Sequence, residues 1–112
     1  MRHVAWAGAI VALVLGAGVA SAQDAGAKGH QAFVDNKCLV CHLVGAEGNK
    51  KGVVMDGVGA RLTADQIRQW ITNAPDMAAK ANSTRKPPMK AYTDLPKETV
   101  DTLVAYLAGL KK

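Results

Sequence analysis

Two cysteines and a histidine lie within five residues of one another, in the stretch KCLVCHLV at 37–44. Cys38 and Cys41 are the only cysteines of the chain, and His42 directly follows the second. Two thiols at this spacing can lie about one helical turn apart, with the imidazole beside them. This arrangement is typical of sites that hold a cofactor or a metal, or that exchange electrons through a dithiol.

Four interpretations of the motif compete. A thioredoxin-like pair favours a βαβ context, for which no strands are predicted, and a zinc site needs four ligands where the motif offers three. A disulfide between Cys38 and Cys41 would close too small a loop to stabilise a fold much. Cys-x-x-Cys-His is the attachment signature of c-type haem, in which the thiols add to two vinyl groups and His42 becomes the proximal iron ligand. The motif therefore predicts one covalent haem c with its iron.

The first residues have the layout of a secretory signal peptide. An apolar run follows a basic start and ends at Ala20-Ser21-Ala22, a small-x-small cleavage site. We expect a signal peptide at 1–22 that is cleaved after Ala22, and a haem domain at 23–112 in the periplasm, without stable membrane insertion. An uncleaved membrane anchor is the alternative, although the apolar run lies at the lower length limit for spanning a bilayer.

Three helices are predicted. We expect the first over about 25–36, the second from the capping box of Thr63 and Gln66 to a stop at Pro75, and the third from Pro96 onward. The third helix carries an apolar stripe at helical spacing, formed by Val100, Leu103, Val104 and Leu107.

Two long loops, 43–62 and 74–95, connect these helices, and neither shows the alternation of a strand. Loops of this length in a small domain normally wrap a ligand or are mobile. A domain this short forms a marginal core by itself and usually gains stability from a cofactor, metal or disulfide. The sequence thus predicts an all-α fold organised around a cofactor.

The second axial position of the iron can hold a histidine, a methionine or nothing, and this choice decides what the haem does. His30 lies on the helix that leads into the motif, so we do not expect it to reach the far face. Three methionines remain, each of which could instead fill the core or lie on the surface: Met55, Met77 and Met89. Met89 follows the stiff pair Pro87-Pro88, and Met77 is its rival in the same loop.

The order of these segments is familiar, because the chain resembles a small monohaem class I c-type cytochrome of the exported bacterial kind. Gly29 and Phe33 resemble the first helix of that family, where a small residue lets the last helix cross closely, and Tyr106 resembles that last helix. The segment GVGARLTADQIRQWI at 57–71 resembles the part that carries a tryptophan near the haem propionates. KPPMKAY at 86–92 resembles the loop that supplies the second axial ligand.

The resemblance implies three to five short helices wrapped around one covalent haem, with His42 and Met89 as axial ligands. It also implies a propionate contact for Trp70, and Arg61 is a further candidate for such a contact. Many relatives carry a proline soon after the motif, whose carbonyl accepts a hydrogen bond from the proximal histidine. The matching segment at 52–54 has none, so the sequence does not identify that acceptor.

Ligation by His42 and Met89 would fill both axial positions, and the soft thioether would favour ferrous iron. Such a haem carries one electron and leaves no position open for a substrate, so we expect an electron carrier and not an enzyme. A five-coordinate haem that binds gases or turns over peroxide is the alternative if Met89 does not ligate.

Positive charge gathers near the motif and in the Met89 loop. Loss of Arg2 with the signal would lower the formal net charge from +5 to +4. Solvated surface side chains are one explanation, and a basic rim that steers acidic redox partners is the other. The rim would consist of Lys37, Lys50, Lys51, Lys80, Arg85, Lys86 and Lys90.

Two kinds of redox partnership fit these features. The protein would be a diffusible periplasmic shuttle, or a bound cytochrome subunit of a periplasmic dehydrogenase such as a sulfite- or alcohol-oxidising enzyme. A terminal oxidase is a further candidate partner. Nucleic acid is not expected as a partner of an exported haem protein, whatever its positive charge.

Overall fold

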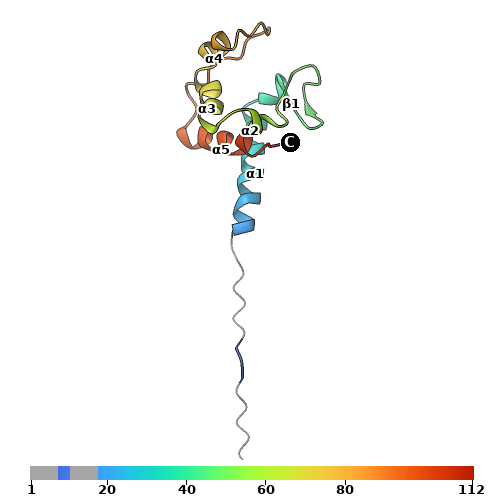
Figure 1. Cartoon of the computed structure of the whole chain (residues 1–112), viewed down its shortest axis with the longest axis vertical. Helices are drawn as coiled ribbons and strands as arrows, with labels where there is room; N and C mark the ends of the chain where they lie inside the picture. Colours follow the sequence, from blue (N-terminus) through green and yellow to red (C-terminus); the bar gives the residue numbers. More distant parts are fainter. Residues whose placement is uncertain (1–7, 11–17) are drawn as a thin grey trace, which may run out of the picture.

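The computed structural model describes residues 8–10 and 18–112, so the predicted signal peptide falls largely outside the described residues. The described chain is mostly helical and carries a small sheet (Figure 1). No helix in this part of the chain is both long and apolar enough to cross a membrane. The elements are α1 (Gly18–Asp35), the 3-10 helix η1 (Cys38–Val40), β1 (His42–Val44), β2 (Glu47–Gly48), β3 (Val53–Val54), α2 (Val58–Arg61), α3 (Ala64–Thr72), α4 (Ala74–Lys80) and α5 (Lys97–Ala108).

The two terminal helices of the domain, α1 and α5, cross in close contact. A Cβ atom added at Gly29 would overlap the Cβ of Tyr106 and lie 3.2 Å from the carbonyl oxygen of Thr102, so a side chain does not fit there. Figure 1 shows α5 lying across the carboxyl-terminal part of α1. The predicted close crossing at Gly29 is confirmed. Because α1 begins at Gly18, it spans the predicted cleavage site, and the domain boundary after Ala22 stays a prediction.

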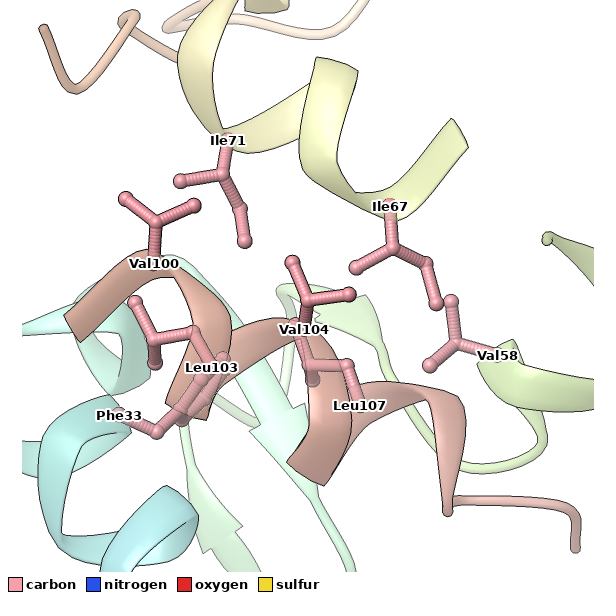
Figure 2. Close-up of a cluster of buried hydrophobic side chains, with 8 residues drawn as sticks. All are labelled: Phe33, Val58, Ile67, Ile71, Val100, Leu103, Val104 and Leu107. Atoms are coloured by element: carbon pink, nitrogen blue, oxygen red, sulfur yellow. The ribbon is translucent and has the colours of Figure 1, made fainter. Parts of the chain in front are cut away.

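A single cluster of buried side chains joins four of the helices in the described chain (Figure 2). Phe33 comes from α1, Val58 from α2, and Ile67 and Ile71 from α3. The predicted stripe of α5 supplies the remaining members, all of them buried: Val100, Leu103, Val104 and Leu107. The cluster fixes α1, and with it the start of the Cys-x-x-Cys-His motif, against the rest of the domain.

The capping box before α3 is confirmed. The Thr63 hydroxyl accepts from the Gln66 amide at 3.2 Å, and the Gln66 side chain accepts from the Thr63 amide at 2.9 Å. The expected loop over 74–95 is partly wrong, because α4 occupies its first residues. Pro75 lies in the first turn of this helix rather than merely ending the previous one, since a missing N–H costs nothing there.

The expectation of a purely all-α fold needs a correction, because the loop that follows the motif forms a three-stranded sheet of order β2-β1-β3. β1 pairs antiparallel with β2 and parallel with β3, with His42 opposite Val53. β2 and β3 have two residues each, too few to show any alternation of apolar and polar side chains. Tertiary contacts with the motif, rather than strand propensity, therefore define these strands.

Candidate haem site

The two cysteines lie on one tight turn. The chain leaves α1 through Lys37, whose φ of 60° is left-handed, and enters η1, where the Cys41 amide donates to the Cys38 carbonyl at 3.2 Å. Both thiols are free, so the structure does not contain the disulfide alternative. Cys38 is half-buried and Cys41 is exposed. Burial, reinforced by the neighbouring Cys41, raises the pKa of Cys38 to about 11, so this thiol is neutral at physiological pH.

The His42 ring is held by a main-chain carbonyl. Its Nδ1 lies 3.2 Å from the Val53 oxygen, and the ring centroid lies 6.0 Å from that of Phe33. A carbonyl only accepts, so Nδ1 carries the proton and the lone pair of Nε2 is free to bind a metal. Burial lowers the pKa of His42, the charge of Arg85 lowers it further, and the Val53 hydrogen bond opposes both. A neutral imidazole with this tautomer is the form that ligates iron.

Val53 thus supplies the acceptor that the sequence left unidentified. The pattern of residues did not reveal it because any residue can offer a carbonyl. Two glycines were the available signal, since a Cβ at Gly48 would overlap the His42 oxygen and one at Gly52 would overlap the Cys41 oxygen. Glycine lets the segment after the motif pack directly on the motif backbone.

The predicted second ligand, Met89, is half-buried in the coil between α4 and α5. No hydrogen bond joins residues 86–91 to the rest of the described chain. Ligation of the iron by Met89 stays a prediction. At the end of this coil, Tyr92 packs against the same hydrophobic core as Cys38. Burial raises the pKa of Tyr92, and the thiols of Cys38 and Cys41 raise it further.

The rival ligands have other surroundings. Met55 packs against the hydrophobic core, whereas Met77 lies half-buried on α4, outside that cluster. His30 lies with Nε2 3.1 Å from a carboxylate oxygen of Glu47 and edge-on to Tyr106, at a centroid distance of 6.2 Å. These contacts tie His30 to β2 and α5.

The two candidate propionate contacts lie on different helices. Trp70 is half-buried on α3. Arg61 is exposed at the end of α2, where its Nη1 donates to the Asp56 carbonyl at 2.9 Å. Among the described residues, no hydrogen bond joins the two side chains. Their contacts with the propionates stay predictions.

The donor chemistry of the motif fits a covalently attached haem. Two free thiols and a neutral imidazole with an available Nε2 share one turn and the strand that follows it. The half-buried side chains of Leu39, Val44 and Tyr92 pack on the same hydrophobic core as Cys38. Among the described residues, no cluster of three histidine, cysteine or acidic side chains could hold a metal ion by itself, so the zinc interpretation gains no support.

Comparisons with known proteins place the chain in a family. A family model described as cytochrome c matches residues 26–111. Cytochrome c oxidase subunit 2 of Alkalihalophilus pseudofirmus is 30% identical over 92 residues, which cover 75% of this chain and 25% of that relative. No solved structure matches significantly. Because the family match spans most of the chain, including the motif, the chain belongs to the cytochrome c family, whose members carry covalently bound haem c with its iron and serve in electron transfer.

Proposed function

We propose that this protein is an exported one-electron carrier, with haem attached through Cys38 and Cys41 and its iron ligated by His42 and Met89. The main observation behind the proposal is the fixed ring of His42, which directly follows the turn that holds both free thiols. Its Nδ1 lies 3.2 Å from the Val53 carbonyl oxygen. When bound, the haem supplies an iron centre that gains and loses one electron. The chain supplies the attachment points and orients the imidazole.

Met89 is the proposed ligand on the opposite face. Pro87 and Pro88 restrict the backbone just before it, which lowers the entropy that the coil loses when the thioether binds. Tyr92, three residues after Met89, packs against the same hydrophobic core as Cys38, which supports an approach from this coil. Met55 instead packs against the hydrophobic core.

Two occupied axial positions favour a carrier over an enzyme. A substrate or dioxygen would find no open coordination site, and little of the chain needs to move when an electron arrives or leaves. The thioether stabilises ferrous iron and so raises the reduction potential. We therefore propose that the protein is not an enzyme.

The basic side chains near the motif support docking of acidic redox partners. All seven proposed rim residues are exposed: Lys37, Lys50, Lys51, Lys80, Arg85, Lys86 and Lys90. None of them forms an ion pair within the described chain, although the Lys90 Nζ lies 5.0 Å from the ring centroid of Tyr92. Charges that are free of internal partners steer an oppositely charged protein into contact.

A second candidate function follows from the matched relative, which is a subunit of cytochrome c oxidase. The chain spans a quarter of the length of that relative, so it corresponds to a part of such a subunit at most. We propose a terminal oxidase as a partner that accepts electrons from this haem. A bound subunit of a periplasmic dehydrogenase is the other arrangement, and co-purification with a larger subunit would distinguish it from a free shuttle.

The proposed export and attachment can be tested together on protein from the periplasmic fraction. Amino-terminal analysis should begin at Gln23, and the intact mass should exceed that of residues 23–112 by one haem that survives acid-acetone extraction. A mass equal to the bare chain would overturn covalent attachment. Recovery only in membranes, with Met1 retained, would instead favour an anchor.

The proposed ligation is tested by two matched substitutions. Wild-type protein should be low-spin and unreactive to carbon monoxide, because both axial positions are occupied. Met89→Ala should admit carbon monoxide and lower the reduction potential, since it removes a soft ligand. Met77→Ala, the control in the same part of the chain, should do neither.

If Met77→Ala alone has these effects, the ligand is Met77. If the wild type binds carbon monoxide readily, the gas-binding alternative replaces the carrier.

A further inference from the structure

Asn49 connects the haem motif to the segment that carries the Val53 carbonyl. Its side-chain Nδ2 donates to the Val40 carbonyl at 3.0 Å, between the two cysteines. Its Oδ1 accepts from the Lys51 amide at 2.9 Å, at the start of the turn that leads to Val53. One exposed side chain therefore bonds the motif on one side and the approaching segment on the other.

The main chain of Asn49 adds to the same connection. Its N–H is shared between the carbonyls of Leu39 and His42, at 3.0 and 3.1 Å, and its carbonyl accepts from the Gly52 amide at 2.9 Å. The resulting turn is closed at both ends. Val53 follows it directly and donates its own N–H to the Cys41 carbonyl at 3.0 Å.

These contacts leave little freedom to the Val53 carbonyl. The residue before it, Gly52, packs so closely on Cys41 that no Cβ fits between them. The register of the turn decides whether the Val53 oxygen faces His42 Nδ1, and the Asn49 side chain hydrogen-bonds both the motif and the turn.

We propose that Asn49 is a positioning residue that holds the Val53 carbonyl against His42 Nδ1, and that it thereby tunes the electron density the imidazole gives to the iron. The inference rests on the proposed ligation by His42. A hydrogen bond from Nδ1–H to a carbonyl makes the imidazole a stronger donor, which favours ferric iron. Loosening the turn weakens this bond and shifts the balance toward ferrous iron.

The direct readout is exchange of the His42 Nδ1 proton with solvent in the full-length holoprotein, measured by nuclear magnetic resonance. Asn49→Ala should speed this exchange by about fivefold or more, which corresponds to a weakening near 1 kcal/mol. It should also raise the reduction potential. Core amides of α5, such as that of Leu103, should keep their protection, whereas a merely structural role would speed exchange there equally.

Two further variants guard the interpretation. Asn73→Ala removes an exposed asparagine hydrogen bond, 3.1 Å to Asp76, far along the chain from the motif, and should change neither the exchange nor the potential. Asn49→Asp keeps the acceptor for the Lys51 amide and loses the donor to Val40, so its exchange should fall between wild type and Asn49→Ala. If Asn49→Ala does not accumulate as folded protein, Asn49→Asp carries the test.

The outcomes separate this inference from the proposed function. Large hyperfine shifts of the His42 ring protons in ferric wild-type protein would establish that His42 binds the iron, and their absence would overturn the proposed ligation. If the shifts are present but both Asn49 variants exchange the Nδ1 proton as slowly as wild type, the positioning role is wrong and the ligation stands.

Discussion

On the histidine side of the proposed haem, every main-chain carbonyl from Cys38 to Leu43 accepts a hydrogen bond. On the methionine side, no residue from 86 to 91 makes one within the described chain. That coil is secured only at its flanks. The Ser83 amide donates to the Ala78 carbonyl at 2.9 Å, and the Tyr92 amide donates to the Ile71 carbonyl at 2.8 Å.

Residue types explain the contrast between the two sides. Gly48 and Gly52 allow main chain to pack against main chain beside the motif, so amides and carbonyls reach one another there. Pro87 and Pro88 have no amide hydrogen, so the coil before Met89 cannot be held in the same way. Its restriction comes from limited backbone rotation instead.

The contrast shows that the two proposed ligands are positioned in different ways. The His42 ring is oriented by the Val53 carbonyl, which the neighbouring main-chain hydrogen bonds hold in place, whereas Met89 lies in a coil that prolines stiffen and that no hydrogen bond holds within the described chain. We therefore expect ligand exchange to occur on the methionine side, while the histidine side behaves as part of the folded core.

The largest expected effect comes from breaking the histidine side. In Gly52→Ala the new Cβ would overlap the Cys41 carbonyl oxygen, so the backbone must shift and the hydrogen bonds beside it weaken. We expect the free energy of unfolding of the holoprotein to fall by about 1–3 kcal/mol, measured by urea titration. Gly26→Ala is the control in α1, where nothing lies within 4 Å, and it should gain about 0.5–1 kcal/mol. Equal stability of Gly52→Ala and wild type would show that the motif side is not rigid.

A smaller effect is expected from loosening the methionine side. Pro88→Gly gives the coil more backbone freedom to lose when Met89 binds the iron. This raises the free-energy cost of ligation by about 0.4–1 kcal/mol. Added imidazole competes for the same axial position, so its apparent affinity should rise about two- to fivefold, followed by the absorption spectrum. Pro96→Gly, at the start of α5, should leave the affinity unchanged. No change in Pro88→Gly would mean that the coil is held by contacts other than its prolines.

The smallest effect is expected from the ion pairs of Asp101, which join α3 and α5. Arg68 on α3 and Lys97 on α5 contact the Asp101 carboxylate at 2.7 and 2.8 Å, and hydrogen bonds from Lys97 and Arg68 lower the pKa of Asp101 below 3.8. A lowered folded-state pKa adds stability above the unfolded value, and this stability is lost as the pH falls through the folded value.

Asp101→Asn should therefore be slightly less stable than wild type at neutral pH, and the difference should close at a pH below about 3.8, seen in urea midpoints across pH. Asp94→Asn, which removes an exposed carboxylate that forms no ion pair within the described chain, is the matched control and should keep the wild-type stability at neutral pH. A gap between Asp101→Asn and wild type that persists at low pH would assign the effect to packing rather than to charge.

Local patterns in the sequence were enough for the haem motif and for much of the helical framework. The Cys-x-x-Cys-His spacing, the capping box at Thr63 and the apolar stripe of α5 each depend on residues within one or two helical turns. Gly29 could be assigned to a helix crossing through the family resemblance, and the clash that any side chain at this position would make with Tyr106 confirms it.

Only the tertiary structure decided the sheet, the start of α4 at Ala74 and the acceptor for His42. The sheet contains strands of two residues, and Pro75 is compatible with either end of a helix. Val53 offers the same carbonyl as any residue, so its role depends on a turn that brings it across from a histidine eleven positions earlier. Side-chain types and short periodic patterns can be read directly from the sequence. A main-chain hydrogen bond between distant residues requires no particular side chain, so it can be seen only in the folded chain.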